Sequence, residues 1–186
     1  MIGKCAHLSP KAKKWSCNSK FATKKFYMVG HYENTYYIKM IQITLKQKIA
    51  ATPLQVRDAL LDHAQLERFF NAKFVLLKKQ NEGEIIGGKG AIRQVIMAGV
   101  RFEERIISAD SNHISYQIID NKPVAEHRGD IYFCVSDNAP TSTEVTYNIR
   151  CKTPWWLPSL VIKFFIKKDI AQALNKLKAN FKGNIS

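Results

Sequence analysis

GKGAIRQVIMAGVRFEERI, residues 88–106, is the stretch that decides the fold, because it encodes two strands and the tight turn between them. Both halves are rich in β-branched and aromatic residues, and Ala98-Gly99 between them is a turn signal. A two-residue turn at this point fixes the register of the two strands. It places Arg93 opposite Glu104 on the inner face. The stretch therefore predicts a hairpin whose inner face carries a pair of opposite charges.

A third strand extends this inner face. A three-residue turn over 110–112 places Glu104 opposite Ile118 and brings Tyr116 onto the same face. Arg93, Glu104 and Tyr116 then form one polar island on an otherwise apolar surface. Two interpretations remain open. The island is either a paired, hydrogen-bonded anchor of the sheet, since a buried charge must be paired, or a polar anchor for a mostly apolar ligand.

The remaining chain predicts one antiparallel sheet and a long helix. A strand starts at Met40, and Thr52-Pro53 then gives a helix N-cap followed by proline at the first helical position. The predicted helices span 54–62, 63–70 and 159–181, and further strands are predicted near 73–79, 91–97, 100–108, 113–119, 127–135 and 143–151. Only the last helix is long enough to cover the sheet. The fold class is therefore α+β, with two short helices after the first strand and a long C-terminal helix over a curved sheet.

Three segments of the sequence resemble a known superfamily. They are IAATPLQVRDALLD (49–62), GKGAIR (88–93) and FEERI (102–106). Together with the element order, they are similar to the START/birch-pollen-allergen-like (SRPBCC) superfamily and its polyketide cyclase/dehydrase-like branch. A frequent tryptophan of that branch is replaced here by Phe69-Phe70. The resemblance covers residues 40–186. It implies a helix-grip fold with a hydrophobic cavity between the sheet and the C-terminal helix.

The expected function is binding, and carrying, a small hydrophobic or lipid-like molecule. The candidate cavity-facing residues are Arg93, Val95, Phe102, Glu104, Tyr116, Ile118, Ile131, Phe133, Tyr147, Ile170 and Leu174. The resemblance leaves a cyclase- or dehydratase-like enzyme acting on a polyketide as the alternative, because some members of the superfamily are enzymes. The sequence contains no Ser–His–Asp or Cys–His arrangement, and His63, His113 and His127 are expected to be exposed or structural.

The net charge of +14 lies at the two ends of the chain. Residues 1–39 and residues 150–186 each carry +7, while residues 40–149 are neutral. We expect 1–39 to be a disordered, Lys-rich leader or an upstream extension of a domain that spans 40–186. Basic ends favour binding to anionic surfaces, such as the phosphate backbones of nucleic acids or lipid headgroups. The alternative is that they are simply solvated segments.

Two adjacent tryptophans, Trp155 and Trp156, lie between prolines and precede Lys163, Lys167 and Lys168. One interpretation packs both rings beneath the start of the last helix. Another places them at the surface of an anionic membrane, since Trp beside Lys suits the boundary between water and lipid. A basic module that binds nucleic acid is a further alternative and is disfavoured, because no exposed sheet face carries alternating aromatic residues.

No metal site or cofactor is expected. The spacing of Cys5, Cys17, Cys134 and Cys151 does not match that of common zinc sites. The glycines within 83–90 lead into a strand, whereas a phosphate-binding loop leads into a helix. No apolar run reaches the roughly 18 residues that cross a bilayer, so we expect a soluble protein. We also expect it to be cytoplasmic and monomeric, with its cysteines as reduced thiols.

Overall fold

The computed structural model describes residues 37–119, 124–136, 139–156 and 158–182. Within them, seven antiparallel strands form one sheet in the order β1-β7-β6-β5-β4-β3-β2. The strands are β1 (Tyr37–Ile49), β2 (Lys73–Lys78), β3 (Ile92–Met97), β4 (Val100–Ala109), β5 (His113–Ile118), β6 (Ala125–Ser136) and β7 (Ala139–Pro154). The helices are α1 (Pro53–Leu61), the short 3₁₀ helix η1 (Leu66–Arg68) and α2 (Ser159–Lys182).

The predicted register of the central strands is confirmed. Arg93 lies opposite Glu104 across β3 and β4, and Glu104 lies opposite Ile118 across β4 and β5. The turn that sets the first of these registers has positive φ at both Ala98 (50°) and Gly99 (80°). This is the backbone of the primed turns that join twisted strands with two residues. The inner face therefore presents the predicted polar island.

The N-terminal end of α1 follows the sequence prediction. The Thr52 hydroxyl accepts a hydrogen bond from the Gln55 backbone N–H, and the Gln55 side chain accepts one from the Thr52 backbone N–H. Pro53 occupies the first helical position, where its missing N–H has no cost. The second predicted helix, over 63–70, is shorter than expected. Only Leu66–Arg68 forms a 3₁₀ turn, and the three-residue spacing that buries Leu66 and Phe69 suits one such turn.

The first and last strands form the longest pair of the sheet. β7 begins at Ala139 and extends to Pro154, which lies opposite Tyr37 at the start of β1. Both strands are longer than the sequence predicts, and β1 begins before the expected start at Met40. The leader was predicted to span residues 1–39. Residues 37–39 instead belong to β1, and residues 1–36, with Cys5 and Cys17, lie outside the described residues.

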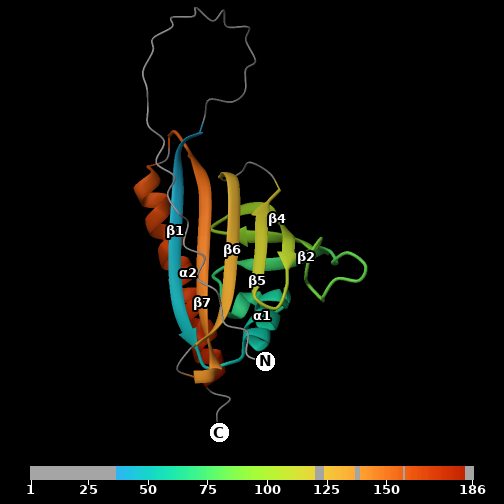
Figure 1. The fold of residues 1–186 in the computed structure, drawn as a ribbon. Coiled ribbons are helices and arrows are strands. Elements are labelled where there is room, and N and C mark those ends of the chain that lie inside the picture. Colours follow the sequence, from blue (N-terminus) through green and yellow to red (C-terminus); the bar gives the residue numbers. More distant parts are fainter. Residues whose placement is uncertain (1–36, 120–123, 137–138, 157, 183–186) are drawn as a thin grey trace, which may run out of the picture. The chain divides into compact units, whose positions relative to one another are not determined.

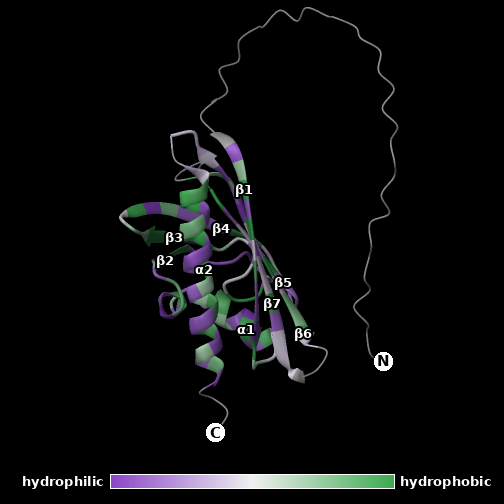
Figure 2. Ribbon diagram, turned by 90° about the vertical axis from the view of Figure 1, so that its left-hand side faces the viewer, coloured by the Kyte–Doolittle hydropathy of each residue, from purple (hydrophilic) through white to green (hydrophobic). Residues whose placement is uncertain are grey.

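The long helix α2 lies along one side of the sheet, and α1 lies on the same side (Figures 1 and 2). The contacts of α2 are concentrated on β1, while α1 contacts β6 and β7. The buried side chains of α2 are Ile170, Ala173, Leu174 and Leu177, which lie from the middle of the helix onward. This is the predicted helix-grip fold. Its solid core lies beneath the second half of α2, and residues 159–169 of this helix have only partly buried or exposed side chains.

Candidate ligand-binding site

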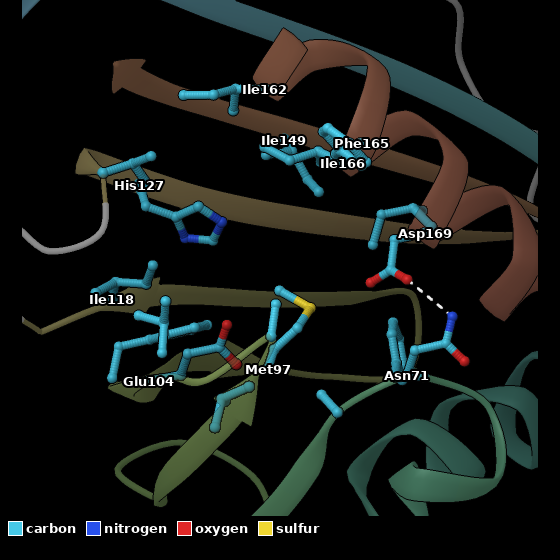
Figure 3. A pocket seen from close by; sticks show the side chains of 18 of the residues that line it. Asn71, Met97, Glu104, Ile118, His127, Ile149, Ile162, Phe165, Ile166 and Asp169 are labelled. Carbon is cyan, nitrogen blue, oxygen red and sulfur yellow. Dashed lines mark hydrogen bonds between the residues drawn. The ribbon is translucent and has the colours of Figure 1, made fainter. Parts of the chain in front are cut away.

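A cavity of about 680 Å³ lies between the inner face of the sheet and the first half of α2. Its lining is mainly apolar and comes from β2 to β7, from the loop before β2 and from α2. Figure 3 shows side chains of the sheet and of α2 facing one another across this space. The volume falls in the range of pockets that bind small organic molecules.

Most of the predicted cavity-facing residues line this space. They are Arg93, Val95, Phe102, Glu104, Tyr116, Ile118, Tyr147 and Ile170. Ile131, Phe133 and Leu174 do not, although all three are buried. They face inward as expected, but the core is closed around them, because α1 contacts β6 and Leu174 lies in the packed second half of α2. The sequence predicts that these side chains face the core, but it does not predict where the packed core ends and the cavity begins.

An ion pair between Arg93 and Glu104 lies at the wall of the cavity. The Arg93 Nε and Nη2 atoms lie 2.8 and 2.7 Å from Glu104 Oε2, and both side chains are only 9% exposed. The guanidinium carbon lies 5.2 Å from the ring centroid of Phe74 and 5.4 Å from that of Tyr116. Rings at this distance attract a cation, so the charge of Arg93 is held by a carboxylate and two aromatic faces.

His63 completes the shell of Arg93. Its Nδ1 atom lies 3.3 Å from Arg93 Nη1, and its Nε2 atom lies 3.0 Å from the backbone oxygen of Gly87. A guanidinium can only donate, so Nδ1 accepts and the proton resides on Nε2, which donates to Gly87. Burial and the charge of Arg93 lower the pKa of His63 to about 4. The histidine is structural, as the sequence analysis expected.

Two tyrosine hydroxyls form a second polar contact in the cavity. The Tyr116 and Tyr147 oxygens lie 2.5 Å apart, and both rings are buried. Tyr116 has room because Gly129 lies opposite it on β6, where a side chain would overlap its ring. Burial raises the pKa of both phenols well above the ordinary value, so both are neutral at physiological pH.

His127 is a lining residue that sequence reasoning did not select. Its imidazole points into the cavity (Figure 3), and its ring centroid lies 5.6 Å from that of Tyr116. In the described part of the chain, its buried Nδ1 atom has no hydrogen-bond partner. Burial lowers its pKa, which favours the neutral ring. A signal was present in the sequence, because His127 shares the two-residue alternation of Ile131 and Phe133.

A polar link at the edge of the cavity was also missed. The Asn71 side-chain amide donates to Asp169 and to Gln172 of α2, each at 3.0 Å, and its oxygen accepts from Lys176 at 3.0 Å. Figure 3 shows the first of these bonds. Asn71 lies in an aperiodic segment between η1 and β2, so no sequence pattern indicates where it points. The link fastens α2 to the loop that precedes β2.

The two adjacent tryptophans are exposed. Trp155 is 62% and Trp156 65% exposed, so the interpretation that packs them under the helix is wrong. They belong to a surface patch with Leu160, Phe164, Phe165, Lys163, Lys167 and Lys168, which we term the aromatic–lysine patch. The upper end of α2 in Figure 2, where this helix begins, is mainly hydrophobic. Phe165 and Lys168 also line the cavity, so the patch borders its opening.

Among the described residues, no group of histidine, cysteine or carboxylate side chains has the arrangement of a metal site. No helix in the described ranges is both long and apolar enough to span a membrane.

A curved sheet that holds a long C-terminal helix, with an apolar cavity between them, is the START-like helix-grip fold. The family model described as polyketide cyclase/dehydrase and lipid transport matches residues 40–182. The chain belongs to this family. No curated protein matches it in sequence.

Solved structures show the same fold at low sequence identity. A START superfamily protein from Mycobacterium smegmatis is 12% identical, with a TM-score of 0.63 over 76% of this chain and 97% of that one. The protein XoxI from Bacillus cereus is 17% identical, with a TM-score of 0.57 over 75% of this chain and 94% of that one. An uncharacterised protein from Bacillus thuringiensis is 16% identical, with a TM-score of 0.56 over 76% of this chain and 98% of that one.

Proposed function

We propose that this protein binds a small apolar or lipid-like molecule in the cavity beneath α2 and carries it. The observation that supports this is the cavity itself, about 680 Å³ with a mainly apolar wall. A water-filled cavity of this kind leaves apolar surface hydrated. A ligand that displaces the water gains roughly 25 cal/mol for each Å² of apolar surface removed from water. The binding energy thus comes from the body of the ligand.

Binding of Nile red, a neutral apolar dye, tests this function. Met97 and Ile96 are neighbours on β3, and only Met97 lines the cavity. Met97→Trp should fill the space and weaken dye binding at least tenfold, while the matched variant Ile96→Trp should bind like the wild type. Equal binding by all three proteins would place the dye outside the cavity. If the protein is purified without a bound ligand and converts an added polyketide into a product, the enzymatic alternative is favoured instead.

We propose further that the ligand is exchanged at anionic membranes through the aromatic–lysine patch. Between Ser159 and Lys168, α2 contains three lysines and no acidic residue. A lysine near an anionic surface contributes about 1 kcal/mol, and exposed tryptophan and phenylalanine rings insert at headgroup depth. Together they support reversible attachment beside the opening of the cavity, where an apolar ligand could pass without entering bulk water.

Co-sedimentation with vesicles of phosphatidylcholine, with and without phosphatidylserine, tests the membrane contact. The Trp155→Ala/Trp156→Ala variant should sediment several-fold less with anionic vesicles. Ile86→Ala is the matched control, because Ile86 is 85% exposed and lies between β2 and β3. Binding should fall at high salt. Equal sedimentation of the tryptophan variant and wild type would rule out docking through this patch.

The cytoplasmic location and the monomeric state remain part of this proposal. The two cysteines in the described residues, Cys134 and Cys151, are both free thiols, which suits a reducing compartment. Burial raises the pKa of Cys151 to about 11, so this thiol is unreactive. Sedimentation equilibrium tests the monomer.

A further inference from the structure

The polar end of the cavity carries no net charge. Arg93 directs Nε and Nη2 to Glu104 and Nη1 to His63, and its faces lie against the rings of Phe74 and Tyr116. A carboxylate that entered the cavity would find this cation already paired and would lie near the negative charge of Glu104. Burying such an unpaired charge is strongly unfavourable.

The hydroxyl pair of Tyr116 and Tyr147 has one proton to spare. Each phenol has a single O–H donor, and one hydrogen bond between the two oxygens uses only one of the two protons. For the other proton, the structure records no acceptor among the described residues. Both tyrosines line the cavity, so this donor is available to a ligand. A ligand that displaces water from the cavity leaves this donor without an acceptor unless it offers an oxygen of its own. A ligand oxygen at this point therefore has a specific advantage.

His127 lies beside this pair, at 5.6 Å between its ring centroid and that of Tyr116. Its side chain lines the cavity, and its Nδ1 is without a partner in the described chain. Because burial lowers its pKa, the ring is neutral at pH 7 and adds no positive charge that could hold an anion. The groups beside a ligand oxygen at the Tyr116–Tyr147 pair, namely the two hydroxyls and the His127 ring, are therefore neutral. The nearby charges of Arg93 and Glu104 are paired with each other.

We propose that the cavity selects an uncharged amphiphile, whose apolar body carries a carbonyl or hydroxyl oxygen that accepts the spare proton of the Tyr116–Tyr147 pair. Carboxylates of the same chain length are disfavoured. The inference rests on the proposed function, that the cavity binds an apolar ligand, and adds the chemistry of the ligand's polar group. The apolar wall provides the binding energy, and the hydroxyl pair provides the discrimination.

Competition against Nile red on the full chain at pH 7 tests the selection. The competitors are decan-2-one, decan-1-ol and decanoate, each of which has ten carbon atoms in an unbranched chain. Decan-2-one and decan-1-ol should each displace the dye at concentrations at least tenfold lower than decanoate does. A decanoate affinity equal to or higher than that of the ketone would overturn the proposal.

The tyrosine variants identify the donor. In Tyr116→Phe or Tyr147→Phe, the remaining hydroxyl loses its partner and can still donate, so each single variant should keep most of its affinity for decan-2-one. The double variant Tyr116→Phe/Tyr147→Phe has no donor left. Its affinity for the ketone should fall about tenfold relative to its affinity for decanoate, after correction for any change in the binding of Nile red, which itself carries a carbonyl oxygen. Retained ketone affinity in the double variant would overturn the proposal. If Nile red itself fails to bind the wild type, the proposed function fails as well, so the two failures are distinguishable.

Discussion

Gly129 on β6 lies opposite Tyr116 on β5, and a Cβ atom at Gly129 would overlap the Tyr116 ring at Cε1 and Cζ. This glycine has ordinary backbone angles, so its role is to leave space rather than to permit an unusual conformation. The ring of Tyr116 crosses the neighbouring strand at this point and places its hydroxyl against Tyr147. A missing side chain on one strand therefore positions a polar group of the cavity that belongs to another.

Gly129→Ala should displace the Tyr116 ring and lower the free energy of unfolding by about 1–3 kcal/mol, the usual cost of overpacking. Urea denaturation measures this change. In the Tyr116→Leu background, where the overlapping atoms are absent, the same substitution should cost much less. Equal costs in the two backgrounds would show that the ring does not depend on Gly129.

The Arg93–Glu104 pair should show strong energetic coupling. Glu104→Leu leaves the buried guanidinium without its carboxylate and should destabilise the protein by about 3 kcal/mol or more, while the double replacement Arg93→Leu/Glu104→Leu should be less harmful. A double-mutant cycle by urea denaturation measures the coupling. The exposed pair Lys46–Glu144, at 2.9 Å, is the control and should couple by less than about 1 kcal/mol. A buried pair that couples no more than this control would contradict the account.

Stability should fall as the pH is lowered from 6.5 to 4, because of His63. Its pKa drops from 6.5 in the unfolded chain to about 4 in the folded one. Between these values the unfolded chain binds the proton and the folded chain does not, so the free energy of unfolding rises with pH. The stabilisation is complete above 6.5 and amounts to about 3 kcal/mol.

His63→Gln is the matched variant for this pH dependence, since glutamine keeps an acceptor for Arg93 and a donor for Gly87 but does not titrate here. Its stability should change less between pH 6.5 and pH 4 than that of the wild type. Some dependence should remain, because the pKa of His127 is also lowered. Identical pH profiles of wild type and variant would show that His63 is not the group responsible.

The Asn71 link should control how fast a ligand leaves. Asn71→Ala removes the hydrogen bonds to Asp169, Gln172 and Lys176 and should accelerate Nile red dissociation several-fold in stopped-flow measurements. Asn180→Ala is the control, because Asn180 also joins α2 to η1, through Arg68 at 2.7 Å, but does not line the cavity. If both variants release the dye at the same rate, the link is structural only.

Removal of residues 1–33 should leave the thermal midpoint unchanged within a few degrees. This deletion tests whether the proposed Lys-rich leader is dispensable. It ends before β1, which begins at Tyr37 rather than at Met40. Differential scanning calorimetry of the two proteins is the measurement. A larger fall would show that the leader contributes to folded-state stability.

The sequence predicted the fold because its decisive signals are local. The Ala98-Gly99 turn allows one register, and that register alone brings Arg93 and Glu104 together. The residues of the site were harder to predict from the sequence, because the boundaries of the cavity depend on where the helices pack against the sheet. Phe133 and Tyr147 both face inward, yet only Tyr147 lines the cavity. His63 and Asn71 act through contacts with distant elements, and no periodicity indicates such contacts.

Native mass spectrometry of the full chain as purified tests the central claim most directly. The account predicts one uncharged amphiphilic molecule per chain in the wild type and in Ile96→Trp, and none in Met97→Trp, whose side chain fills the cavity. If all three proteins show only the mass of the ligand-free chain, and none shows saturable binding of Nile red, the claim that this cavity is a ligand-binding site is contradicted.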